Sequence, residues 1–137
     1  MKVIQHISFN CSDVKSQEKF YTKHFGFCRA CVFKAGTDEE FIMLRLGNTC
    51  LELCPAQTQQ KSLKATEQPV GFKHLAFDVP DLDAAIAALH ADGIETDKII
   101  DLSSILEGFR ICFFHDPDGN RIELMEGYRD DILNRVV

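Results

Sequence analysis

The feature that most constrains the fold of this chain is an internal repeat. Sliding the first half along by 68 positions places His6–Phe9 on His74–Phe77 without a gap, and it also places Asp13-Val14 on Asp81-Leu82. A self-match at one fixed period indicates two copies of the same structural unit. The sequence therefore predicts a pair of similar modules.

Both halves show the same order of predicted elements. In the first half, apolar patterning predicts a helix over about 14–25 and strands over 2–10 and at about 27–35, 40–47 and 49–54. Ser12 or Asp13 can cap the helix, and Gly26 can end it. In the second half, a helix opens at Pro80-Asp81 and stops at Gly93, with strands over 72–79 and at about 95–101, 109–115 and 120–126. Each module is thus expected to be β-α-β-β-β, which predicts an α+β fold.

The length of 137 residues allows one domain, or two half-size units that share a core. We expect a single domain over 1–137, built from module one at about 1–55, a polar linker at about 56–70 and module two at about 71–127. The tail, 128–137, is expected to contain a short helix. Apolar residues make up 45% of the chain, which argues against disorder.

Composition excludes some partners and predicts a compartment. The net charge of −6 gives no basic footprint for nucleic acid. No apolar run approaches the roughly 18 residues of a membrane span, so no membrane partner is expected. The six cysteines occur without a secretory signal, which predicts reduced thiols and a cytoplasmic protein.

Each half carries one His and one Glu at matched places on its strands. His6 lies on the first strand of its module and Glu52 on the last, and His74 and Glu123 repeat this arrangement. If the first and last strands of a module are adjacent, each His meets its own Glu, and pairing of the modules brings all four together. One His or Glu on a strand is most often an ordinary structural residue. Two pairs at matched positions favour a site for one divalent cation with four protein ligands.

Several segments resemble a known family. They are Ile4–Phe9, Lys19–Phe27, Asn48–Leu53, Lys73–Ala76 and Asp116–Leu124. Through them residues 4–126 resemble the vicinal oxygen chelate superfamily, which includes glyoxalase I, bleomycin resistance proteins and extradiol dioxygenases. The resemblance implies two βαβββ modules that form a curved sheet cradling a metal.

The resemblance also implies an activity. The full ligand set His6, Glu52, His74 and Glu123 is most like that of glyoxalase I, a lactoylglutathione lyase. Short bacterial members favour Ni²⁺ or Co²⁺ and longer members favour Zn²⁺, so the length of this chain implies Ni²⁺ or Co²⁺. The implied reaction is proton transfer next to a carbonyl through a metal-stabilised enediolate. Glu123 is the implied base and Glu52 the second candidate. We expect a homodimer that acts on a small molecule such as a thiol adduct.

Two other functions stay open at this point. Methylmalonyl-CoA epimerases carry a similar four-ligand arrangement, so an acyl-CoA is the alternative substrate, with Glu39 or Glu40 as a further acid or base. A small-molecule-binding or resistance protein of the same fold is the non-enzymatic alternative. In glutathione-using bacterial glyoxalases, the resemblance implies an Arg at the first of two further positions and an Asn at the second. This chain has Asn10 at the first position and Ala56 at the second.

Three arginines on predicted strands are candidates for meeting an anionic substrate. They are Arg45, Arg110 and Arg121. An arginine on a strand is more often simply solvated, and the sequence does not separate the three.

Overall fold

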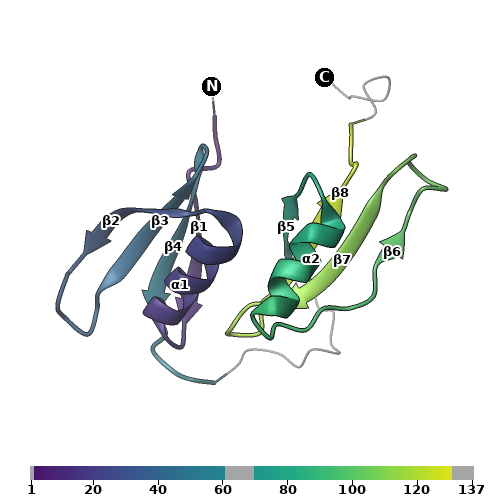
Figure 1. Cartoon of the computed structure of the whole chain (residues 1–137). Helices are drawn as coiled ribbons and strands as arrows, with labels where there is room; N and C mark the ends of the chain where they lie inside the picture. Colours follow the sequence, from purple (N-terminus) through teal and green to yellow (C-terminus); the bar gives the residue numbers. More distant parts are fainter. Residues whose placement is uncertain (1, 61–69, 131–137) are drawn as a thin grey trace. The chain divides into compact units, whose positions relative to one another are not determined.

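The computed structural model describes residues 2–60 and 70–130, and the chain divides into two compact units. The first unit runs as far as Gly71 and also includes the short segment Asp116–Gly119. The second unit comprises Phe72–His115 and the chain from Asn120 onward. In each unit one helix lies beside one sheet (Figure 1). The expectation of a single domain over 1–137 stays a prediction.

The first unit contains one helix and four strands. In chain order they are β1 (His6–Cys11), α1 (Val14–Phe25), β2 (Cys28–Phe33), β3 (Phe41–Leu46) and β4 (Thr49–Pro55). The strands lie in the order β1-β4-β3-β2, so the first and last strands are neighbours. β1 and β4 run parallel, and the other pairs are antiparallel.

The second unit repeats this arrangement. Its elements are β5 (Leu75–Asp78), α2 (Leu82–Ala91), β6 (Ile100–Asp101), β7 (Arg110–His115) and β8 (Arg121–Glu126). The strand order is β5-β8-β7-β6, again with a parallel pair formed by the first and last strands. The predicted α+β fold with two β-α-β-β-β modules is therefore confirmed. Among the described residues, neither sheet closes into a barrel.

The helices begin and end where local chemistry predicts. Asp13, and not Ser12, is the N-cap of α1, and its side chain accepts hydrogen bonds from two backbone N–H groups in the first turn. Gly26 ends α1 in the left-handed conformation with φ 73°, which favours glycine. Asp81 is the N-cap of α2, and its side chain accepts a hydrogen bond from the Ala84 N–H.

The expected strand over 95–101 is largely absent, because its pairing with β7 is interrupted. Thr96 forms an isolated bridge with Phe114, and regular pairing resumes only where Ile100 faces Ile111. The stretch from Thr96 to Ile100 therefore contains one residue more than the stretch of β7 that it faces, from Phe114 to Ile111. β2 has a similar irregularity between Arg29 and Cys31, so both outer strands carry a bulge.

Each sheet turns one face toward its helix. In the first unit, Phe20 and Tyr21 of α1 are buried, as are Leu51 and Leu53 of β4. In the second unit the corresponding buried residues are Leu82, Leu89, Ile122 and Leu124. Because side chains alternate across a strand, the residue between Leu51 and Leu53 lies on the opposite face of its sheet, and so does the residue between Ile122 and Leu124. These two residues are Glu52 and Glu123.

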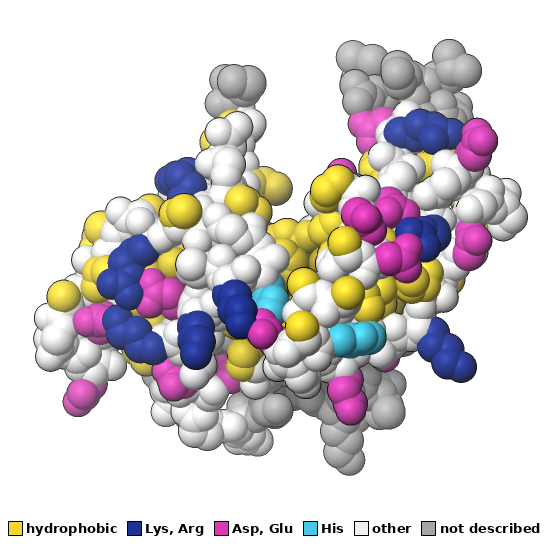
Figure 2. All heavy atoms as spheres, viewed as in Figure 1, with side chains coloured by type: hydrophobic (Ala, Val, Ile, Leu, Met, Phe, Trp, Pro, Cys, Tyr) yellow, Lys and Arg dark blue, Asp and Glu magenta, His cyan; other side chains and the backbone are white. Residues whose placement is uncertain are grey.

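Two sequence-based expectations lie partly outside the described residues. The polar linker at about 56–70 includes 61–69, and the short helix expected in the tail falls largely on 131–137. Neither α1 nor α2, the helices of the described part, has the length and apolar character needed to span a bilayer. Basic and acidic side chains are interspersed on the face of the molecule shown in Figure 2.

Candidate metal centre

The first His–Glu pair lies on the parallel strands β1 and β4. Ser8 is the register partner of Glu52, and His6, two residues earlier on β1, shares their face. His6 Nε2 lies 3.8 Å from Glu52 Oε2, and the two side chains are 43% and 23% exposed. His6 Nδ1 also contacts the side-chain oxygen of Gln5. The pair therefore presents a nitrogen and a carboxylate toward the open face of the first sheet.

The second pair repeats this geometry, with His74 immediately before β5 and Glu123 on β8. Ala76 is the register partner of Glu123, and His74 lies two residues before Ala76. His74 Nε2 lies 2.6 Å from Glu123 Oε2, and these side chains are 22% and 12% exposed. The second pair is thus closer and better shielded from water than the first. The same register offset in both units is what the internal repeat requires.

The donor types suit a divalent cation of borderline hardness. Imidazole nitrogen and carboxylate oxygen are the usual ligands of Zn²⁺ and its neighbours. His74 Nε2 is the ring nitrogen that faces Glu123. His74 Nδ1 is buried and has no hydrogen-bond partner in the described part of the chain. Within either unit, the described residues bring together two potential ligands and no group of three.

The two positions that the resemblance links to glutathione hold other residue types in this chain. Asn10 lies on β1 opposite Cys54 and is exposed. Ala56 follows β4, and its N–H donates to the carbonyl of Cys11 at 2.9 Å. Neither residue provides the cationic or amide side chain that the resemblance assigns to its position.

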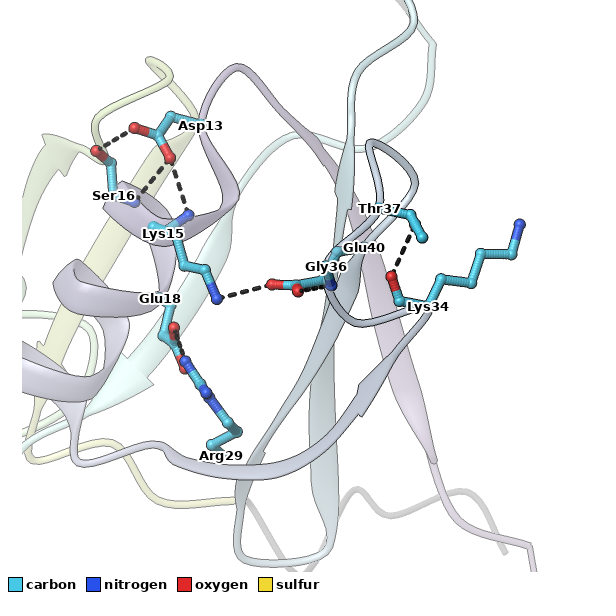
Figure 3. A network of polar contacts seen from close by, with 9 residues as sticks. All are labelled: Asp13, Lys15, Ser16, Glu18, Arg29, Lys34, Gly36, Thr37 and Glu40. Atoms are coloured by element: carbon cyan, nitrogen blue, oxygen red, sulfur yellow. Dashed lines mark hydrogen bonds and ion pairs between the residues drawn. The ribbon is translucent and has the colours of Figure 1, made fainter.

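Glu40 and Glu39 belong to the loop between β2 and β3. Glu40 accepts hydrogen bonds from Lys15 Nζ at 2.7 Å and from the Gly36 N–H at 2.9 Å (Figure 3). Lys15 holds the pKa of Glu40 below its usual range by hydrogen bonding, and the Gly36 N–H acts in the same direction. Glu39 contacts Lys34. Both carboxylates are thus paired with lysines, Glu40 with Lys15 of α1 and Glu39 with Lys34, which gives no support to a role as a further acid or base.

The three candidate arginines have different environments. Arg110 forms ion pairs with Asp83 at 2.9 Å and with Glu126 at 2.7 Å, so its charge is satisfied within the second unit. Arg45 is exposed on β3. Arg121 lies over the ring of Phe113, with 4.0 Å between its guanidinium carbon and the ring centre.

Phe113 is a site residue that sequence analysis missed. It is the register partner of Glu123, and its ring centre lies 5.4 Å from that of His74 in an edge-to-face arrangement. The alternation of β7 was the only available signal, because it places Phe113 opposite the buried Cys112 and Phe114.

Cys50 and Cys54 lie beside Glu52 on β4. Cys50 is buried, and Cys54 Sγ lies 3.9 Å from Ser8 Oγ. Burial raises the pKa of the Cys54 thiol, and the charge of Glu52 acts in the same direction. This thiol is therefore a poor ligand compared with the neighbouring carboxylate.

Comparison with known families gives a match over most of the chain. Residues 3–124 match the Glyoxalase/Bleomycin resistance protein/Dioxygenase superfamily. The chain is 35% identical over 135 residues to the uncharacterized protein YwkD of Bacillus subtilis (strain 168), covering 92% of this chain and 98% of that protein.

Solved structures have the same fold. A glyoxalase family protein from Enterococcus faecalis is 31% identical with a TM-score of 0.74, covering 91% of this chain and 98% of its own. Lactoylglutathione lyase from Agrobacterium tumefaciens is 21% identical with a TM-score of 0.65, covering 93% and 95%. At that identity the second likeness shows the fold alone.

Proposed function

Because the chain belongs to the Glyoxalase/Bleomycin resistance protein/Dioxygenase superfamily, we propose that it is a divalent-metal-dependent lyase or isomerase of the glyoxalase I type. The observation that carries the proposal is the His–Glu pair, which occurs in both units at the same strand register. One His or Glu on a strand is most often structural, whereas two matched pairs of metal-ligand residue types favour a metal site.

His6, Glu52, His74 and Glu123 would hold the metal ion. Two carboxylates balance the charge of a divalent cation, and two imidazoles add nitrogen ligands. When bound, the ion supplies a Lewis acid that stabilises negative charge developing on substrate oxygens. We propose Ni²⁺ or Co²⁺ as the resident ion, with Zn²⁺ as the alternative.

Glu123 is the proposed base. Its carboxylate accepts the proton from the carbon next to the substrate carbonyl and returns it to the carbonyl carbon, while the hydroxyl proton moves from one substrate oxygen to the other. The reaction is therefore an isomerisation without an external reactant. The low exposure of Glu123, 12%, limits exchange of that proton with water. Glu52, which is 23% exposed, is the second candidate.

The identities of Asn10 and Ala56 favour a second candidate function. Neither offers the contact expected for glutathione, so an acyl-CoA epimerase remains a proposal beside the glyoxalase. In that reaction one carboxylate removes the proton from one side of the carbon and a second group returns a proton from the other. Glu123 and Glu52 can serve as these two groups.

The test measures turnover of the methylglyoxal–glutathione hemithioacetal and of methylmalonyl-CoA. Chelator-stripped protein is assayed before and after addition of Ni²⁺, Co²⁺ or Zn²⁺. We expect metal to restore activity and Glu123→Gln to lower it at least about 100-fold while metal stays bound. Glu95→Gln, which alters an exposed carboxylate, is the control.

Each outcome has a defined meaning. Activity only with methylmalonyl-CoA would select the epimerase. Bound metal without turnover of either substrate would overturn both reactions, and a tight organic ligand without bound metal would indicate a binding protein. Full activity of Glu123→Gln would remove Glu123 from the role of base.

We further propose that the protein is a cytoplasmic homodimer. All six cysteines are free thiols, which is the state that a reducing compartment maintains. Light scattering at micromolar concentration tests the dimer, and the mass of a single chain would contradict it.

A further inference from the structure

Arg121 places a positive charge on the same face of the second sheet as Glu123. The two residues are separated by one position on β8, so their side chains leave the strand on the same side. The guanidinium carbon lies 4.0 Å from the ring centre of Phe113, which is within the range of a cation–π contact. Phe113 is also the register partner of Glu123. The ring therefore holds the cation beside the proposed base.

The same ring connects Arg121 with His74. Its centre lies 5.4 Å from the imidazole centre, with the two planes at 68°. The guanidinium carbon of Arg121 is 4.0 Å from the same ring centre, so its distance from the imidazole centre cannot exceed the sum of these two values. Since His74 Nε2 is 2.6 Å from Glu123 Oε2, all three polar groups surround one aromatic side chain within the second unit.

Arg121 differs from Arg110 and Arg29 in its charge balance. Arg110 is paired with Asp83 and Glu126, and Arg29 donates two hydrogen bonds to Glu18. In the described part of the chain no carboxylate pairs with Arg121. A guanidinium has five N–H donors in its plane, and stacking on a ring leaves those at its edge available for an incoming anion.

We propose that Arg121, held on Phe113, binds a carboxylate group of the substrate next to Glu123. The bound compound is then a small organic acid whose carboxylate lies a few bonds from the reacting carbon. A bidentate pair between guanidinium and carboxylate would orient this compound on the sheet face. That the bound acid is the substrate rests on the proposed function, whereas carboxylate binding by Arg121 does not.

The test uses malonate and its uncharged counterpart malonamide as probes on metal-free protein. Binding is followed by ¹H–¹⁵N NMR, including the Nε–Hε signal of Arg121. We expect malonate to shift this signal and malonamide to leave it unchanged. Arg121→Gln should weaken malonate binding by about tenfold or more, because a charge-assisted hydrogen bond is lost.

Two further variants make the result specific. Arg121→Lys keeps the charge but not the planar fork, so we expect affinity between those of the wild type and Arg121→Gln. Lys98→Gln removes an exposed charge elsewhere in the second unit and should leave affinity unchanged. Equal malonate affinity in the wild type and Arg121→Gln, or equal binding of the two probes by the wild type, would overturn the proposal.

This experiment is independent of turnover. If malonate binding depends on Arg121 but no metal-restored activity is found, the carboxylate site stands and the proposed reaction falls. If activity is found but malonate binds the wild type and Arg121→Gln equally well, the proposed reaction is supported and this inference is wrong. Should Arg121→Gln fail to fold, the comparison of Arg121→Lys with Lys98→Gln decides the outcome.

Discussion

The phenol of Tyr21 donates a hydrogen bond to Oδ2 of Asp116 at 2.8 Å, although 95 positions separate them in the sequence. Both side chains are buried. Asp116 begins the turn between β7 and β8, and this turn belongs to the first unit. Asp118 in the same turn accepts hydrogen bonds from the Ser12 N–H at 3.0 Å and from Gln17 Nε2 at 2.8 Å. A segment of the second repeat is thus anchored on α1 of the first.

Loss of the Tyr21 hydroxyl should destabilise the protein. In Tyr21→Phe, the buried carboxylate of Asp116 loses a donor, and we expect the free energy of unfolding to fall by about 1–3 kcal/mol. Asp116→Asn keeps an oxygen that can accept from Tyr21 and should cost less. Urea unfolding of the three proteins measures these differences, and equal midpoints would show that the bond has no net effect.

The same phenol predicts a loss of stability at alkaline pH. Burial raises the pKa of Tyr21 above its ordinary value of 10.0, and the negative charge of Asp116 acts in the same direction. The folded state therefore disfavours the phenolate. Its contribution to stability is complete below pH 10 and declines as the pH rises above that value. Absorbance at 295 nm should show Tyr21 ionising only as the protein unfolds, and Tyr21→Phe should lose this part of the pH dependence.

The cap of α1 predicts a dependence on acid. Asp13 accepts from the N–H groups of Lys15 at 2.9 Å and Ser16 at 3.2 Å (Figure 3). The bonds from Ser16 are the main reason that the pKa of Asp13 lies below 3.8. Its stabilising effect is present at neutral pH and is lost as the pH falls below 3.8 through the lowered folded value.

Two substitutions distinguish the hydrogen bonding of the N-cap residue Asp13 from the effect of its negative charge. Asp13→Asn should retain most of the stability at pH 7, since asparagine is also a good N-cap, but should lose the contribution to acid sensitivity. Asp13→Ala should be less stable at pH 7. Urea midpoints at pH 7 and pH 3 test both, and an alanine variant as stable as the wild type would contradict the cap.

The cysteines should differ sharply in reactivity. Cys28 and Cys31 are exposed, whereas Cys11, Cys50 and Cys112 are buried. Burial, followed by the charges of Asp118 and Asp116, raises the pKa of Cys11 to about 12. Iodoacetamide at pH 8 should therefore label Cys28 and Cys31 in the native protein, and the buried thiols only in urea. Labelling of native Cys11 at the rate of Cys28, read by peptide mass spectrometry, would contradict its burial.

The sequence predicts the ends of a helix correctly where those ends depend on interactions between residues close together in the chain. The helix over 14–25 matched α1 because Asp13 and Gly26 fix its ends by short-range hydrogen bonding and backbone conformation. The strand expected over 95–101 did not form as a whole, since its length depends on pairing with β7. Apolar alternation does not report a bulge in that pairing.

The sequence by itself determined the two-module fold, because a self-match at fixed spacing and apolar periodicity are both properties of the chain order. It also indicated His6, Glu52, His74 and Glu123 as a set, whose role as metal ligands stays a prediction. Only the tertiary structure decided how Arg121 and Phe113 lie beside Glu123, and that Asp116 meets Tyr21. These contacts depend on strand register and on packing between distant segments, and neither is written in the local pattern of residues.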